Sequence, residues 1–219
     1  MIEPSLQIGG GNWANKSDSL LGYHKDGANF YADELTFSRN SLGSYTDANG
    51  LVQSMPYNLL QQSNTFGVSP WNITDGTTTS GQSSYDGTLN ATLFDVSVAG
   101  GNIRQDINAI GVNNFSIYAK KGTANGIRIR FDQDSDANVY IDLTDGSVFT
   151  SGNTLSINVD SVGNGWYKID FSFEAVGLNL FRIIITDGTT TLSTGSIYIQ
   201  DAQLNQGSTA LPYFATTTR

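Results

Sequence analysis

Tyrosine, arginine and aspartate recur at alternate positions of several short apolar segments. In IRIRFDQ the isoleucines alternate with Arg128 and Arg130, and in VYIDL the apolar residues alternate with Tyr140 and Asp142. Period-two alternation places such polar side chains together on the outer face of a sheet. The face is expected to carry Tyr118, Arg128, Arg130, Tyr140, Asp142 and Arg182.

This polar face suits the binding of a glycan. Aromatic rings stack on sugar faces, and arginine and aspartate hydrogen-bond to hydroxyl groups. Two alternatives stay open: a subunit interface, where tyrosine and arginine are also enriched, and ordinary solvated surface.

The segment DQDSDAN places Asp132, Asp134 and Asp136 at the alternate spacing of a calcium loop. However, Ala137 stands where such a loop needs glycine, and Leu143 stands where it needs its bidentate glutamate. We therefore expect a polar hairpin turn here.

Residues that could support catalysis are scarce. There is no cysteine, His24 is the one histidine, and the glutamates are Glu3, Glu34 and Glu174. Glycoside hydrolysis needs two carboxylates about 5–10 Å apart, and most aspartates here occupy turn positions. The Gly-rich IGGGNW lacks the spacing and the lysine of a phosphate-binding loop. We expect no enzyme, with a polysaccharide depolymerase as the less favoured alternative.

The composition excludes further classes. Eleven Lys and Arg stand against 20 Asp and Glu, for a net charge of -9 over 219 residues. Such a chain has little with which to neutralise phosphates, so nucleic-acid binding is not expected. No apolar run is long enough to span a bilayer. The first residues lack the basic and apolar regions of a secretory signal, so synthesis in a cytoplasm is expected.

Short strands separated by Asx-Gly turns dominate the chain after residue 86. Asn125-Gly126, Asn164-Gly165 and Asp187-Gly188 supply the positive φ of tight turns. This pattern predicts an all-β, two-sheet antiparallel β-sandwich. The strands are expected at 91–98, 115–121, 127–133, 139–143, 155–159, 166–173, 180–186 and 196–204.

Residues 1–57 differ from the rest, which is expected to form one domain over 58–219. They hold aromatic residues but too few apolar ones to close a core, and they predict an extended arm with little regular structure apart from a hairpin within 45–58. Trp13, on a Gly-rich backbone, can be buried only by something else. The expected subunit or particle attachment residues are Trp13, Leu20, Leu21, Tyr23, Phe30 and Tyr31.

Several phrases carry a resemblance to known families. NLLQQSNTFGVSPW (58–71) resembles the first strand of jelly-roll carbohydrate-binding modules. FSIYAKKG (115–122), GNGWYKIDFSF (163–173) and IYIQDAQLNQGSTALPYF (197–214) resemble domains of bacteriophage virion proteins. In the arm, residues 4–23 and 36–60 resemble the leader that precedes such a domain.

The resemblance implies a jelly-roll structural protein of a phage particle: a capsid decoration, head fibre or tail fibre, commonly a homotrimer. Its partners would be other virion proteins, copies of itself and a host surface glycan. Gln200-Asp201 departs from the Trp-Gly usual in the phage domains. Asp201 instead resembles the carboxylate that helps bind a structural calcium in carbohydrate-binding modules; no other cofactor is implied.

Overall fold

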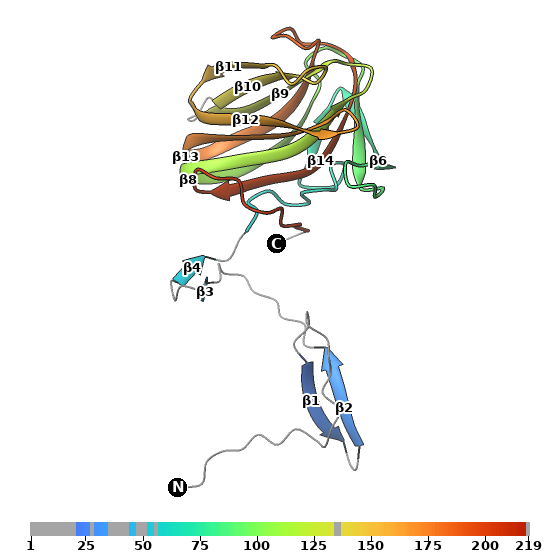
Figure 1. The fold of residues 1–219 in the computed structure, drawn as a ribbon, viewed down its shortest axis with the longest axis vertical. Coiled ribbons are helices and arrows are strands. Elements are labelled where there is room, and N and C mark those ends of the chain that lie inside the picture. The colour runs from blue at the N-terminus through green and yellow to red at the C-terminus, as the bar shows by residue number, and fades with distance from the viewer. Residues whose placement is uncertain are drawn as a thin grey trace. The chain divides into compact units, whose positions relative to one another are not determined.

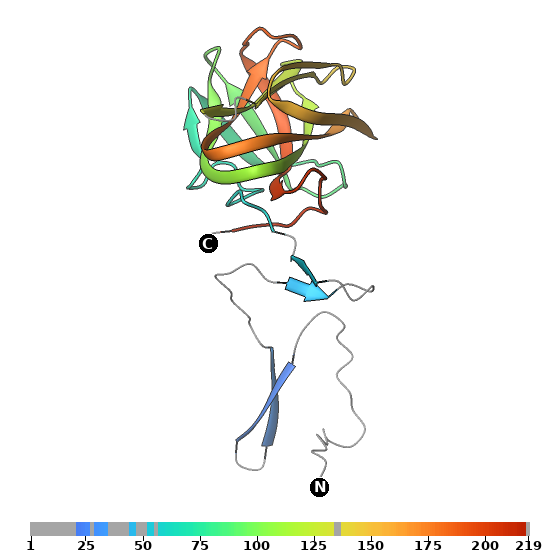
Figure 2. The ribbon, with the colours of Figure 1, turned by 90° about the vertical axis from the view of Figure 1, so that its left-hand side faces the viewer.

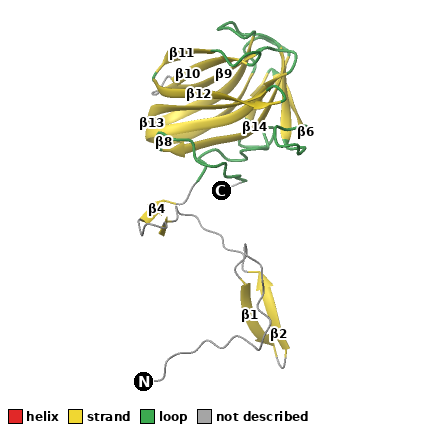
Figure 3. Ribbon diagram, viewed as in Figure 1, coloured by secondary structure: helices red, strands yellow, loops and turns green. Residues whose placement is uncertain are grey.

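The computed structural model describes residues 21–26, 29–34, 44–46, 52–54, 57–133 and 137–217. Within these ranges every helix or strand assigned is a β-strand (Figure 3). None of them forms a helix of the length and apolarity that a membrane crossing requires. The abundance of Gly, Ser, Thr and Asn, which disfavour helix and favour turns, agrees with this result.

The chain divides into two units, Met1–Ser41 and Leu42–Arg219. The described part of the first is a hairpin of β1 (Leu21–Asp26) and β2 (Asn29–Glu34), which was not predicted. The hairpin predicted within 45–58 is present as β3 (Ser44–Thr46) and β4 (Val52–Ser54). The predicted boundary between an arm and a domain at residue 57 stays a prediction.

The second unit contains the antiparallel β-sandwich that the sequence predicts (Figures 1 and 2). Its strands are β5 (Asn72–Thr74), β6 (Gly76–Gln82), β7 (Ala91–Val96), β8 (Asn102–Lys121), β9 (Gly126–Gln133), β10 (Ala137–Asp142), β11 (Val148–Gly152), β12 (Thr154–Gly163), β13 (Trp166–Thr186) and β14 (Gly195–Gln206). We name two layers after their pairing. The β9 layer contains β11, β10, β9, the second half of β13, the first part of β8, and β5. The β14 layer contains β12, the first half of β13, the second part of β8, β14, β7 and β6.

The two longest strands, β8 and β13, pair with each other from one layer into the other. Predicted strands 166–173 and 180–186 are therefore parts of one strand, and 115–121 is the end of another. Gly111 and Gly177 interrupt the two strands with φ values of 74° and 139°. Glycine adopts such values without a steric penalty, which lets each strand change direction while pairing continues.

Odd-numbered side chains of β8 and β13 face the core along both layers, as alternation requires. The centre is a cluster of phenylalanines, in which the ring of Phe131 lies 4.2–5.9 Å from its neighbours between ring centroids. These rings, all fully buried, are Phe115, Phe131, Phe171, Phe173 and Phe181. The predicted inward residues Ile127, Ile129 and Phe131 are confirmed as core.

The segment before β5 and the C-terminal segment are tied together. The Gln62 amide donates to the Thr217 carbonyl over 3.1 Å, and the Thr216 hydroxyl donates to the Leu60 carbonyl over 2.5 Å. The Ser63 hydroxyl contacts the Tyr213 hydroxyl at 2.8 Å. The C-terminal segment is thereby held against the end of the β14 layer.

Candidate functional site

The outer surface of the β14 layer carries a group of aromatic rings. Tyr118 lies on β8, opposite Lys168 of β13 and Gln200 of β14. Tyr85, from the connection between β6 and β7, stacks on Tyr118 with ring centroids 3.7 Å apart and planes 8° apart. Trp166 meets the Tyr85 ring edge-on and is almost fully buried. The Tyr118 ring is thus held by neighbours rather than free to rotate.

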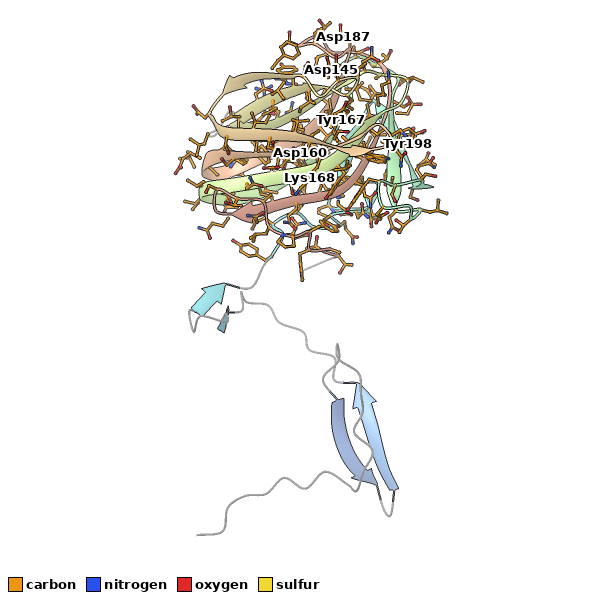
Figure 4. The ribbon with its side chains drawn as sticks, viewed as in Figure 1. Asp145, Asp160, Tyr167, Lys168, Asp187 and Tyr198 are labelled. Carbon is orange, nitrogen blue, oxygen red and sulfur yellow. The ribbon has the colours of Figure 1, made fainter. Side chains whose placement is uncertain are left out.

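A pocket of about 280 Å³ opens beside Tyr118. Lys168 and Ser116 contribute from the sheet, and Figure 4 marks Lys168 on β13. The C-terminal segment forms the opposite wall. The residues that line this tyrosine pocket are Ser116, Tyr118, Lys168, Asp201, Ala210, Leu211, Pro212 and Tyr213. Tyr85 is not among them, so Tyr85 supports the Tyr118 ring without lining the pocket.

Asp201 supplies the carboxylate of the pocket from a β-bulge. The register of β14 against β8 shifts between Gln200 and Gln203, and Asp201 has a φ of 54°. Its carboxylate accepts the Tyr85 hydroxyl over 3.0 Å and the Gln200 amide over 3.4 Å. Its backbone amide donates to Oδ1 of Asn64 over 3.0 Å. A bulge re-aims a side chain that regular pairing would place elsewhere.

Burial alters the acid–base properties of this site. It raises the pKa of the Asp201 carboxyl above its ordinary value, an effect that the hydrogen bond from Tyr85 opposes. Burial also raises the pKa of Tyr213 to about 12 and raises the pKa of Tyr85. Both phenols therefore keep their protons at neutral pH and can donate hydrogen bonds.

Five of the six predicted glycan-binding residues lie on the outer face of the β9 layer. Arg182 on β13 lies directly opposite Arg130 on β9, and Arg128 lies opposite Tyr140 on β10. Asp142 follows at the end of β10, where its Oδ1 accepts the Thr144 amide over 2.7 Å.

Arg104, which the sequence reading did not select, joins this group on β8 opposite Arg182. The alternation of Ile103, Gln105 and Ile107 could have shown that Arg104 faces outward. We call Arg104, Arg128, Arg130 and Arg182 the arginine face.

Polar contacts hold the guanidinium groups of Arg128, Arg130 and Arg182. Asp132, 8% exposed, forms ion pairs with Nε of Arg130 and, at 3.0 Å, with Nε of Arg182. Nε of Arg128 donates to Oδ1 of Asn138 over 2.8 Å, and its guanidinium lies 5.0 Å from the centre of the Tyr140 ring. Burial lowers the pKa of Arg128.

The expectation of one shared polar face is wrong for Tyr118. β8 and β13 run through both layers, so their register places Tyr118 opposite Lys168, far along β13 from Arg182. Tyr118 belongs to the tyrosine pocket and the other five belong with the arginine face. The glycan-binding role of these residues stays a prediction. Sequence reasoning missed Tyr85, Lys168 and Tyr213 because no local pattern links them to Tyr118.

The structure describes four of the six predicted attachment residues, all in the β1–β2 hairpin. Trp13 and Leu20 lie outside the described residues. Leu21 and Tyr23 are on β1, and Phe30 and Tyr31 are on β2; the attachment role of all six stays a prediction.

The side chains around Asp201 do not match calcium, which takes six to eight oxygen ligands. The Tyr85 hydroxyl and the Gln200 amide donate to its carboxylate. Among the described residues no three acidic or histidine side chains gather where they could hold a metal. Asp132 pairs with arginines, and residues 134–136 are outside the described part. The calcium site stays a prediction from which we derive no function.

Comparisons with known proteins give partial structural similarities. No protein-family model and no curated sequence matches the chain. Similar solved structures include the enzymatically active domain of bacteriophage CBA120 tailspike protein 4 (16% identity, TM-score 0.40, 67% of this chain and 21% of that one). Another is the Clostridium thermocellum xylanase 10B CBM22-1-GH10 modules complexed with xylohexaose (15%, 0.44, 70% and 29%). A third is TmCBM61 with β-1,4-galactotriose (14%, 0.40, 69% and 100%).

This chain therefore spans less than a third of the first two of these structures. All the TM-scores quoted lie below 0.5, so the fold and the candidate site are defined by the chain's own strands and contacts.

Proposed function

We propose that the β-sandwich is a non-catalytic glycan-binding module whose tyrosine pocket receives a sugar ring. The observation that carries this proposal is the Tyr118 ring, fixed by the stacked Tyr85 at the wall of a pocket that also holds a carboxylate and an ammonium group. A flat aromatic wall with a few polar groups is the usual make-up of a small-ligand site.

Each part of the pocket has a role in this proposal. The Tyr118 ring offers an apolar surface to the C–H face of a sugar. The Asp201 carboxylate accepts hydrogen bonds from sugar hydroxyls, and Lys168 and Ser116 donate to them. Stacking against Tyr85 fixes the Tyr118 ring before binding, which reduces the entropy lost when the sugar binds.

The proposal is of a binding module rather than a hydrolase because of the carboxylates. Glycoside hydrolysis uses a pair of them across the scissile bond. Asp201 is the one carboxylate in the lining of the tyrosine pocket, so the lining does not supply such a pair. A measured release of reducing ends from any polysaccharide bound by the chain would contradict this part of the proposal.

Binding is tested with the full chain on a glycan array, followed by titration of the best ligand. We expect Tyr118→Ala to weaken binding at least tenfold, because it removes the ring that contacts the sugar. Tyr118→Phe keeps the ring and should bind within about threefold of the unaltered chain. Phe214→Ala serves as a control, since Phe214 is 49% exposed and does not line the pocket. Equal binding by Tyr118→Ala would refute the assignment.

We further propose that this module is a non-enzymatic component of a bacteriophage particle: a capsid decoration, head fibre or tail fibre. Residues 1–57 would attach it to virion proteins or to copies of itself, most simply as a homotrimer. Support comes from the sequence resemblance, whose phrases 163–173 and 197–214 fall on the start of β13 and on β14 with the segment after it.

The virion role is tested separately from glycan binding. Light scattering with size-exclusion chromatography should give three times the 23.5 kDa of one chain, and deletion of 1–57 should reduce that mass to a single chain. A monomeric full chain that phage particles do not contain would refute this role and leave the glycan proposal standing.

A further inference from the structure

Arginine side chains form a row across three neighbouring strands of the β9 layer. Arg182 on β13 has Arg104 directly opposite on β8 and Arg130 directly opposite on β9. Neighbouring strands lie about 4.8 Å apart, so the row extends over about 10 Å. Arg128 lies two residues from Arg130 on the same strand and therefore on the same face.

We propose that this arginine face is a second binding surface, distinct from the tyrosine pocket, and that it binds a polysaccharide carrying carboxylate or sulfate groups. The inference goes beyond the proposed sugar-binding pocket and does not depend on it, since the two sites share no residue.

The charge distribution supports an anionic ligand. The chain has a net charge of -9, yet four of its 11 lysines and arginines gather here. Like charges directly opposite on neighbouring strands are unfavourable. Asp132 offsets this for Arg130 and Arg182. Asp106 lies opposite Leu180, and Asp142 is turned to the Thr144 amide. Among the described residues of these rows, positive side chains therefore outnumber negative ones, and an anion would balance the difference.

Three of the guanidinium groups, those of Arg128, Arg130 and Arg182, are also held in place before a ligand binds. Arg130 and Arg182 meet the buried Asp132 through Nε, and their side chains are 32% and 30% exposed. Arg128 is held by Asn138 and by the Tyr140 ring. The planar fork of arginine matches the two oxygens of a carboxylate or sulfate, and the guanidinium stays charged at any physiological pH.

A polysaccharide fits this face better than a nucleic acid does. Tyr140 places an aromatic ring beside Arg128, where a sugar can stack. Duplex DNA carries one negative charge per about 1.7 Å of its axis. The overall charge of -9 repels so dense a polyanion more strongly than an acidic polysaccharide with one charge per sugar, such as polygalacturonate.

The experiment titrates the full chain with polygalacturonate, dextran sulfate, neutral dextran and duplex DNA. We expect binding to at least one of the two acidic polysaccharides, weakening at least fivefold from 50 to 300 mM NaCl, and no binding to neutral dextran at this face. Arg104→Gln/Arg182→Gln should weaken acidic binding at least tenfold. The matched control Lys120→Gln/Lys121→Gln removes the same charge from the end of β8 and should change it less than twofold.

Three outcomes would overturn the proposal. Failure of both acidic polysaccharides to bind excludes the ligand class. An equal loss in the lysine control assigns the binding to overall charge. Tighter binding of DNA, with the same dependence on Arg104 and Arg182, assigns the face to nucleic acid.

Two further variants keep the test clear. Tyr118→Ala should leave acidic binding unchanged, so failure of the tyrosine pocket is distinguishable from failure of the arginine face. Arg104→Lys, which keeps the charge and loses the fork, should weaken binding about threefold and serves if the double variant does not fold. Retention of full affinity by Arg104→Lys and Arg104→Gln would remove Arg104 from the site.

Discussion

The ring of Tyr85 lies flat against the ring of Tyr118, with centroids 3.7 Å apart and planes 8° apart. Tyr85 also donates its hydroxyl to the Asp201 carboxylate over 3.0 Å. One side chain outside the pocket lining therefore positions both the aromatic wall and the carboxylate of the tyrosine pocket.

Two substitutions of Tyr85 should separate these contributions. Tyr85→Phe keeps the stacking and removes a hydrogen bond to a carboxylate, a loss of about 1.5–3 kcal/mol where buried and less at this half-buried position. Tyr85→Ala also removes the stacked ring, worth about another 0.5–1.5 kcal/mol beyond its buried area. Urea unfolding should rank the variants in this order. Glycan affinity should fall more for Tyr85→Ala, and equal affinity of the two variants would show that the stacking does not position Tyr118.

Asp201→Asn should change how stability depends on pH. Burial raises the pKa of Asp201 in the folded chain, so the folded state binds more protons than the unfolded state once pH exceeds the unfolded pKa of about 4. Stability is therefore lost as pH rises from about 4 through the raised folded pKa. Asparagine does not ionise, tolerates the positive φ at this position and can still accept from Tyr85.

Unfolding free energies of both proteins between pH 3 and pH 8 check this expectation. The difference between the two proteins should grow in favour of the Asp201→Asn variant as pH rises, and then level off. Taking the difference cancels Asp145 and Asp187, whose pKa values are lowered by local hydrogen bonds. A difference that shrinks with rising pH would mean that ionised Asp201 stabilises the fold.

Asn58→Ala should strongly destabilise the second unit. The Asn58 side chain is buried, donates to the Ala202 carbonyl over 2.8 Å, and accepts the Leu60 and Leu204 amides over 3.0 and 2.9 Å. Each buried partner left unsatisfied costs about 1–3 kcal/mol, so the expected loss is at least about 3 kcal/mol. Asn158→Ala, at an exposed position of β12, should cost less than about 0.5 kcal/mol. Similar losses in both would refute the role of Asn58.

Gly126 and Gly111 should respond in opposite order to alanine and asparagine. A Cβ at Gly126 would come 2.6 Å from the Gly188 nitrogen, so a larger side chain clashes more. The expected loss in the free energy of unfolding is above about 1–3 kcal/mol, and it is larger for asparagine than for alanine. A Cβ at Gly111 meets nothing within 4 Å, but φ is 74°. Alanine there costs about 1–2 kcal/mol, and asparagine less because it tolerates left-handed backbone. Thermal unfolding of the four variants checks this; the same order at both glycines would contradict it.

Much of the fold could be predicted because alternation and Asx-Gly turns are local signals. Ile127, Ile129 and Phe131 alternate with polar residues, and a strand with one face on a core must show that pattern. The continuity of β13 through both layers was not predictable. Gly177 interrupts the apolar pattern, and in a sequence such an interruption indicates the end of a strand.

The candidate site also has a part that local sequence patterns predict and a part that they do not. The sequence by itself determined that Arg128, Arg130 and Tyr140 share a face, since period two and a short hairpin leave one arrangement. Only the tertiary structure decided that Tyr118 lies in the other layer, and that Tyr85, Lys168 and Asp201 surround it. These residues are distant in the chain, so their contacts depend on strand register and on a bulge in β14. Neither feature can be predicted from the local pattern of residue types.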